Sequence, residues 1–220
     1  MRKYTLDETI FNNIDNEEKA YWLGFILADD SIQIRKSGQA ILKLTLAIKD
    51  KNHIQKFLNF IKSNMPIKEY LVGNGANSNK SKSCEVTITS KQIVKDLEKL
   101  GIGQRKSHIV QIPTVKEEFT RHLIRGIWDG DGSVLYEPYS KKYPNNFNPR
   151  LQICGNKFVL NKINDIFEQK LSLSKSKLSP VKSIFLFRKS TNSAKKSSGI
   201  FIQKLHYSFN KKVRKSKSLY

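Results

Sequence analysis

Apolar residues follow a strand periodicity and then a helix periodicity in two separate parts of the chain. The segment 40–60, AILKLTLAIKDKNHIQKFLNF, begins with apolar positions at every second residue and continues as an amphipathic helix from Lys51. The segment 148–167, NPRLQICGNKFVLNKINDIF, has the same plan, and Lys157 stands at the equivalent helix start. Alternation with a period of two predicts strands that have one buried and one solvated face.

A longer apolar helix pattern also occurs twice. Residues 16–33 read NEEKAYWLGFILADDSIQ, and residues 116–134 read KEEFTRHLIRGIWDGDGSV. An offset of 102 residues aligns Gly24 with Gly126, Ala28 with Gly130, Asp29 with Asp131, and Ser31 with Ser133. A third landmark, the triplet Arg-Lys-Ser, closes the two copies at 105–107 and 214–216. Three matched landmarks in the same order indicate an internal repeat.

The repeat divides the chain into an N-terminal half, 1–112, and a C-terminal half, 113–220. Each half is predicted to contain a helix, a strand pair, a helix, a strand pair and a helix, which is an α+β arrangement. Asp15 and Glu18 have the spacing of a capping box at the first repeat helix. The predicted strand segments are 31–35, 40–48, 84–90, 133–137, 149–155, 182–189 and 199–207. The polar segments 73–83 and 189–198, and the segment 138–149 with its three prolines, are predicted to be hairpin loops.

The chain is strongly basic. It has 40 Lys plus Arg against 19 Asp plus Glu, which gives a net charge of +21. Residues 139–220 hold 19 basic and 2 acidic residues, a surplus of 17. Such a surplus strains a compact protein unless a polyanion offsets it, and the phosphates of nucleic acid are the natural partner. An anionic membrane surface, or solubility alone, is the alternative explanation.

Other features of the sequence narrow the class of protein. Cys84 and Cys154 form neither a metal-binding spacing nor a disulfide framework. The first ten residues, MRKYTLDETI, lack the apolar core of a signal peptide, and the apolar run 21–28 is too short to span a bilayer. We therefore expect a soluble intracellular protein without a membrane partner. Its many Lys and Asn residues suggest an AT-rich genome, which points to an organelle (mitochondrion or plastid) or to phage or bacterial cytoplasm.

The repeated helix ends in a carboxylate in both copies. A helix C-terminus already carries about half a negative charge, so Asp29 and Asp131 add to an unfavourable field. Each helix also has two small residues four apart, which would let two backbones pack closely. This predicts two helices side by side with both acids at one end, where carboxylates and backbone carbonyls could bind a hard divalent cation. Ordinary core packing explains either copy alone, but the duplication favours a metal site.

The sequences WLGFILADD (22–30) and IRGIWDGDG (124–132) resemble the two signature helices of the LAGLIDADG homing endonucleases. Through the repeat, the resemblance covers essentially the whole chain. It implies an αββαββα fold in each of two pseudo-symmetric halves, which together form a DNA-binding saddle of antiparallel sheets. It also implies a monomeric, site-specific endonuclease that cleaves a long, loosely palindromic double-stranded DNA by metal-assisted phosphodiester hydrolysis. Asp29 and Asp131 would bind Mg²⁺, assisted by the backbone carbonyls of Ala28 and Gly130.

Further site residues follow from the same resemblance. The last motif position, usually Gly, is Asp30 in the first copy, where it either tolerates a positive φ or adds a third carboxylate near the metal ions. Family members keep a basic residue near each scissile phosphate, and the repeated triplets make Lys106 and Lys215 the catalytic candidates. Arg105 and Arg214 are weaker candidates. Ordinary phosphate contact, or a solvated charge, is the alternative for both lysines.

The predicted sheets would contact DNA through the polar side chains of one face. A curved sheet can follow the major groove, and every second residue of a strand points to the same face. The expected DNA-binding residues are Gln33, Arg35, Lys43, Thr45, Glu85, Thr87 and Thr89 in the first half, and Tyr136, Arg150, Gln152, Arg188 and Gln203 in the second. Lysines in the hairpin tips are expected to contact phosphates without reading sequence.

Other functions remain open at the level of the sequence. Relatives of this family include intron RNA maturases and DNA-binding proteins that do not cleave, so intron RNA is an alternative partner. A structural RNA-binding protein would explain the charge but not the duplicated helices that end in Asp. An excised intein is disfavoured, because the chain lacks a Cys or Ser start and a His-Asn end.

Overall fold

The computed structural model describes residues 3–29, 31–73, 81–104, 112–140, 143–172, 174–181 and 184–190. The chain divides into two compact units: Met1–Lys106 with Pro113–Gly126 form unit 1, and Ser107–Ile112 with Ile127–Tyr220 form unit 2. Helix α4 (Glu117–Asp131) belongs to both, because its residues up to Gly126 lie in unit 1. The sequence halves 1–112 and 113–220 stay a prediction.

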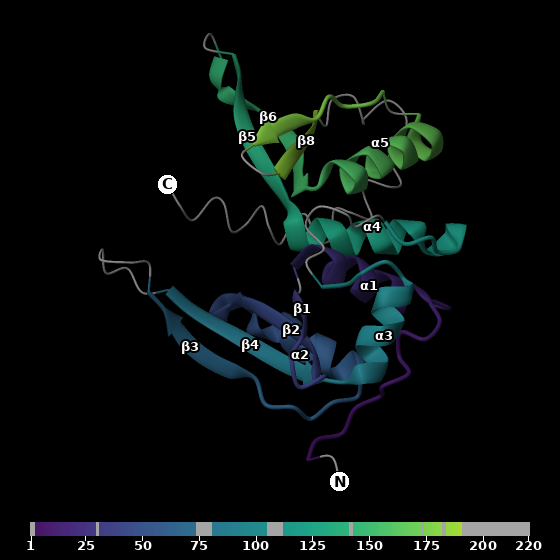
Figure 1. The fold of residues 1–220 in the computed structure, drawn as a ribbon. Coiled ribbons are helices and arrows are strands. Elements are labelled where there is room, and N and C mark those ends of the chain that lie inside the picture. Colours follow the sequence, from purple (N-terminus) through teal and green to yellow (C-terminus); the bar gives the residue numbers. More distant parts are fainter. Residues whose placement is uncertain are drawn as a thin grey trace. The chain divides into compact units, whose positions relative to one another are not determined.

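Unit 1 is a four-stranded antiparallel sheet with helices (Figure 1). The strands are ordered β1-β2-β4-β3, so the two central strands come from different strand pairs. Its elements, besides the first part of α4, are α1 (Glu17–Asp29), β1 (Ser31–Ile34), β2 (Ala40–Ala47), the 3₁₀ turn η1 (Ile48–Asp50), α2 (Lys51–Phe60), β3 (Lys68–Val72), β4 (Ser81–Thr89) and α3 (Lys91–Lys99). Helix α2 begins at Lys51, as the periodicity predicts.

One face of this sheet forms the core of unit 1. Leu42 and Leu44 of β2 and Val86 and Ile88 of β4 are buried, and they alternate with more exposed polar residues along each strand. The helices supply the other side of the core through residues that are 0–2% exposed: Ile54, Phe57 and Leu58 of α2, and Ile93, Val94 and Leu97 of α3. Burial of each such side chain contributes on the order of 1.5–3 kcal/mol, so this face fixes the direction of the opposite one.

Hydrogen bonds connect the N-terminal segment before α1 to the end of α2 and the start of α3. Lys62 Nζ donates to Asp7 Oδ2 at 3.1 Å, and the Ser90 hydroxyl, at the N-cap of α3, donates to Glu8 Oε1 at 2.5 Å. At α1 itself, the Asn16 side chain accepts the Lys19 N–H at 2.9 Å. The capping box expected at Asp15 and Glu18 is therefore wrong, because the helix starts one residue later and Asn16 takes the capping role.

Unit 2 repeats the sheet topology of unit 1. Its strands form a four-stranded antiparallel sheet in the order β5-β6-β8-β7, the same order by position as β1-β2-β4-β3. Its elements after α4 are β5 (Gly132–Ser140), β6 (Tyr143–Gly155), α5 (Lys157–Leu171), β7 (Ser179–Val181) and β8 (Ile184–Ser190). Helix α5 begins at Lys157, as predicted. The αββαββα order is complete in residues 17–99, and αββαββ is present in the described part of the second half, which confirms the α+β fold class.

Two predictions about strands are wrong. The segment 138–149 is not a loop, because β5 and β6 pair as a long hairpin. The paired residues extend from Gly132 with Ile153 to Ser140 with Tyr143, and the register shifts between Pro138 and Ser140. Its prolines are tolerated because only residues 150–155 of β6 also pair with β8, so among the described residues the earlier part of β6 has no second strand to pair with. Figure 1 shows this hairpin running past β8. In unit 1, strand β3 was not expected, since the short segment 68–72 has no strong apolar alternation.

The part of the chain that the structure describes contains no helix whose length and apolar character would let it cross a membrane.

Candidate active site and nucleic-acid interface

Helices α1 and α4 touch backbone to backbone at Gly126, within unit 1. An ideal Cβ placed on Gly126 would lie 2.0 Å from the Tyr21 carbonyl oxygen and 2.7 Å from the Phe25 nitrogen. No side chain fits there unless the helices separate, since real Cβ atoms essentially never approach so closely. The close packing predicted from the small residues of these helices is therefore confirmed at Gly126.

The contacts along this pair of helices also give its direction. His122 Nε2 of α4 lies 3.1 Å from Glu17 Oε2 at the start of α1. One turn further on, the Arg125 guanidinium lies over the Tyr21 ring, 4.7 Å from its centroid. The partner positions increase together along both helices, so the described part of α4 in unit 1 runs parallel to α1. Each helix then continues for a few residues and ends in Asp.

Both helices end in a carboxylate without a basic residue in the last turn. Asp29 is exposed and Asp131 is half-buried, and the residues before them, Ala28 and Gly130, are also half-buried. Each carboxylate lies at the negative end of a helix dipole, where a cation is favoured. Carboxylate and backbone carbonyl oxygens are the donors that hard divalent cations prefer, so these residues fit Mg²⁺. Among the described residues there is no cluster of three His, Cys, Asp or Glu side chains that could hold a metal ion.

The glycine at the last position of the second motif, Gly132, is required for space. A Cβ on Gly132 would lie 2.5 Å from the Trp128 carbonyl oxygen and 2.7 Å from the Trp128 indole. The positive-φ glycines among the described residues are Gly38 and Gly101, so Gly132 is not held by a left-handed backbone conformation. The equivalent residue of the first copy, Asp30, lies outside the described residues, and its effect stays open.

The predicted DNA-binding residues of the first half lie together on one face of the unit 1 sheet. The register aligns Gln33 with Ile41 and Thr89, Lys43 with Thr87, and Thr45 with Glu85, so these polar residues share the face opposite to the buried one. Gln33 and Thr89 are exposed, and Lys43, Thr45, Glu85 and Thr87 are half-buried. The structure thus brings these six residues together, while their role in DNA binding stays a prediction.

Strand β3 adds two residues to this face that the sequence analysis missed. Lys68 aligns with Glu85, and Tyr70 aligns with Ser83, one row further along. Tyr70 is 38% exposed although it is a large aromatic residue. The segment 68–72, Lys-Glu-Tyr-Leu-Val, does not alternate, so the available signal was its Tyr, Leu and Val, which favour a strand.

The same face contains a hydrogen-bonded ion pair between neighbouring strands. Lys43 Nζ lies 2.7 Å from Glu85 Oε2, with 32% and 14% of the two side chains exposed. The hydrogen bond from Lys43 lowers the pKa of the Glu85 carboxyl, partly opposed by burial and supported by a hydrogen bond from Tyr70. Glu85 in turn raises the pKa of Lys43. Both groups are therefore charged at neutral pH.

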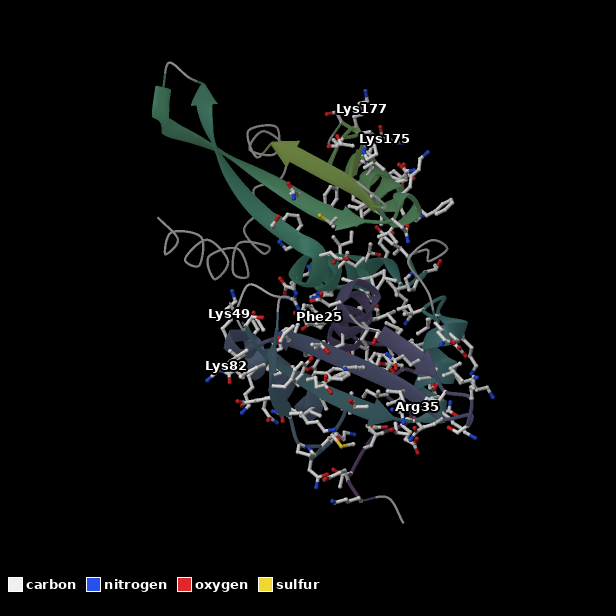
Figure 2. The ribbon with its side chains drawn as sticks, turned by 60° about the vertical axis from the view of Figure 1, so that its left-hand side comes forward. Phe25, Arg35, Lys49, Lys82, Lys175 and Lys177 are labelled. Carbon is white, nitrogen blue, oxygen red and sulfur yellow. The ribbon has the colours of Figure 1, made fainter. Side chains whose placement is uncertain are left out.

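Basic residues lie at both ends of the unit 1 sheet. Figure 2 shows Arg35 at one end and Lys49 and Lys82 at the other, with all three exposed. Arg35 lies just beyond β1, in the turn to β2, where its guanidinium donates to Gln39 Oε1 at 2.9 Å. Lys82 falls within the predicted hairpin loop 73–83 but belongs to β4, where it aligns with Leu71 of β3 and so has the register position of the helix-covered face. The position of Arg35 suits a contact with a phosphate that flanks a bound duplex.

In unit 2 the sheet register groups three of the predicted DNA-binding residues. Gln152 of β6 lies between Ser133 and Arg188, and Arg150 lies between Leu135 and Ser190 two residues earlier. Arg150, Gln152 and Arg188 therefore occupy positions of one face. Tyr136 pairs with Pro149, so its register position belongs to the opposite face and the structure does not group it with the other three. Lys106, Lys215, Gln203, Arg105 and Arg214 lie outside the described residues.

Comparison with solved structures identifies the fold. Three of the matching structures are of meganucleases. I-SmaMI bound to uncleaveable DNA with a TTGT central four is 15% identical over 88% of this chain and 84% of that chain, with a TM-score of 0.56. The LAGLIDADG meganuclease I-CpaMI bound to uncleaved DNA is 14% identical over 84% of each chain, also with a TM-score of 0.56. I-SmaMI bound to an uncleaved DNA target in the presence of calcium ions is 15% identical over 84% of each chain, with a TM-score of 0.54.

The chain therefore has the fold of the LAGLIDADG meganucleases, which confirms the fold that the two motifs implied. Neither the protein-family models nor the curated proteins include a match to the sequence. At 14–15% identity the likeness establishes the fold, and the function has to be argued from the residues.

Proposed function

We propose that this protein is a homing endonuclease of the LAGLIDADG type that cuts both strands of a long DNA target. The fold is that of enzymes whose structures contain bound DNA. The net charge of +21 favours a polyanionic partner, and one sheet face of unit 1 presents polar and basic side chains at alternating positions. Together these features support double-stranded DNA as the substrate.

The observation that carries the proposal is the pairing of α1 with α4. The two helices meet at Gly126 without space for a side chain, run in parallel there, and each ends in Asp. A protein that only binds nucleic acid has no need to place an acid at the end of two paired helices, where it repels phosphate. A metal-dependent nuclease does need carboxylates there.

Asp29 and Asp131, with the carbonyls of Ala28 and Gly130, are the residues that we propose to hold Mg²⁺. When bound, a divalent cation supplies Lewis-acid polarisation of a phosphate oxygen and lowers the pKa of a bound water. The chain's own contribution is to fix two carboxylates on rigid helices and to hold the duplex on the polar sheet faces. Lys106 and Lys215 are proposed to donate to the negative charge that develops at each scissile phosphate.

The proposed target follows from the repeat. Two units with the same strand order suggest two half-sites, and their different side chains suggest half-sites of different sequence. A loosely palindromic target read by a monomer is the expected result, because one chain already carries both copies of the motif.

The test is to select bound duplexes from a random library and to incubate the selected target, on a plasmid, with the protein in Mg²⁺ or in EDTA. The proposal expects linear product in Mg²⁺ and none in EDTA. Selection of a defined target that stays intact in Mg²⁺ would instead identify a DNA-binding relative without cleavage. Preferential binding of a structured intron RNA over every duplex would favour a maturase.

A further inference from the structure

Glu85 is exceptional in its position on the polar face of the unit 1 sheet. The strand positions that share this face hold Ser31, Gln33, Ile41, Lys43, Thr45, Ala47, Lys68, Tyr70, Val72, Ser81, Ser83, Glu85, Thr87 and Thr89. Among these described residues Glu85 supplies the one carboxylate. A carboxylate on a surface that approaches DNA is repelled by phosphates, so its presence there needs a compensating contact.

The surroundings of Glu85 keep it ionised and in place. Lys43 donates a hydrogen bond to it at 2.7 Å from the neighbouring strand, and Tyr70 donates another from the other side. The carboxylate accepts several hydrogen bonds through its two oxygens, and the Lys43 ammonium has three N–H donors. Glu85 accepts hydrogen bonds from Lys43 and Tyr70, so its carboxylate can still accept another. Lys43 uses one of its N–H groups on Glu85, so its ammonium can still donate two hydrogen bonds.

The chemistry of this pair matches one base pair better than the others. In the major groove guanine presents two adjacent acceptors, O6 and N7, while cytosine presents an amino donor beside them. Lysine donates to the guanine acceptors and glutamate accepts from the cytosine amino group. Lys43 and Glu85 present a donor and an acceptor side by side, which is the combination that a G·C edge requires. An A·T edge offers its amino group between two acceptors and adds a thymine methyl, so it satisfies this pair less well.

We propose that Lys43 and Glu85 together read a single G·C base pair in the half-site that unit 1 contacts. The inference rests on the proposed DNA binding, and it assigns both a base pair and two specificity-determining residues. It does not require that the protein cleaves the DNA.

The chain contains a matched control for this proposal. Lys51 Nζ, at the start of α2, and Glu69 Oε1, on β3 of the same sheet, form an ion pair of the same residue types at 2.6 Å. Glu69 aligns with Cys84, so it lies on the face that the helices cover, opposite to Glu85. Glu69→Gln therefore removes one negative charge and one ion pair without changing the polar face.

The experiment is to select bound duplexes from a random library, with calcium in place of magnesium, using the wild type, Glu85→Gln, Lys43→Gln and Glu69→Gln. We expect a wild-type consensus with one G·C position that both Glu85→Gln and Lys43→Gln relax, by about 5- to 150-fold in relative affinity. Glu69→Gln should reproduce the wild-type consensus. Thermal unfolding of each variant confirms that it is folded, and Lys43→Gln carries the test if Glu85→Gln does not fold.

Three results would overturn the proposal in different ways. A consensus that Glu85→Gln and Lys43→Gln leave unchanged removes the assigned role but keeps the DNA-binding function. Equal relaxation by Glu69→Gln shows that the effect comes from charge or stability rather than from base contact. A wild type that enriches no sequence ends both this inference and the proposed function.

Discussion

Gly126 lies against the carbonyl of Tyr21 so closely that a Cβ on Gly126 would be 2.0 Å from that oxygen. The neighbouring atom is backbone on a rigid helix, so it cannot move aside as the end of a side chain could. This contact sets the approach of α1 and α4 in unit 1, and it explains why the second motif needs glycine at this position.

Gly126→Ala should therefore destabilise the protein strongly. Overpacking typically costs about 1–3 kcal/mol, and a backbone overlap of this size should lie at the upper end or beyond it. Chemical unfolding measures the change. Gly73→Ala is the control, because a Cβ on Gly73 meets nothing within 4 Å. Equal stability of the two variants would contradict the close helix contact.

Asp7 should make the stability depend on acid pH. Hydrogen bonds from Lys62 and then from Thr9 lower the pKa of the Asp7 carboxyl from its usual value of 3.8. A carboxyl whose pKa is lowered in the folded state contributes stability above the unfolded pKa, and this contribution is lost as the pH falls through the folded value. Urea unfolding from pH 7 to pH 3 should show Asp7→Asn less stable than wild type at neutral pH, with the difference shrinking in acid. A difference that is constant with pH would exclude this linkage.

Arg35 should add affinity without specificity. Its exposed position in the turn that follows β1 suits a phosphate contact, so Arg35→Ala should weaken binding to every duplex to a similar extent. The slope of log K against log salt should fall in magnitude by about 0.9 for each lost phosphate contact. Titrations at several salt concentrations measure both effects, and Lys56→Ala, on the exposed face of α2, should leave the slope unchanged. An Arg35→Ala effect confined to one target sequence would instead mean base contact.

The repeat, the fold class and the polar face of the unit 1 sheet could be predicted from the sequence because they depend on periodicity. The helix ends at Asp29 and Asp131 were also correct, since a charged residue followed by a strand pattern terminates an apolar helix clearly. The capping role of Asn16 was missed because Asp15 offers the same chemistry one residue away. Such a choice depends on the path of the preceding segment.

The errors in the strands have another cause. Prolines at 138, 144 and 149 argue against a strand in general, yet they lie where the β5–β6 hairpin extends past β8 and needs no second ladder. Tyr136 was placed with Arg150 and Gln152 because it is polar, whereas the register puts its position on the other face. Sheet edges and register depend on neighbours that are distant in sequence, so local pattern cannot supply them.

The central claim is that Asp29 and Asp131 are the metal-binding carboxylates of a DNA endonuclease, and cleavage by their Asn variants tests it most directly. Asp29→Asn and Asp131→Asn should each reduce the rate of target cleavage in Mg²⁺ by more than about 100-fold, the upper range for groups that only support a metal ligand. Binding of the target, measured in calcium, should stay equal or become tighter because negative charge is removed. Asp15→Asn, before the N-terminus of α1, should cleave normally. Cleavage at the wild-type rate by the Asp29→Asn/Asp131→Asn double variant would contradict the account.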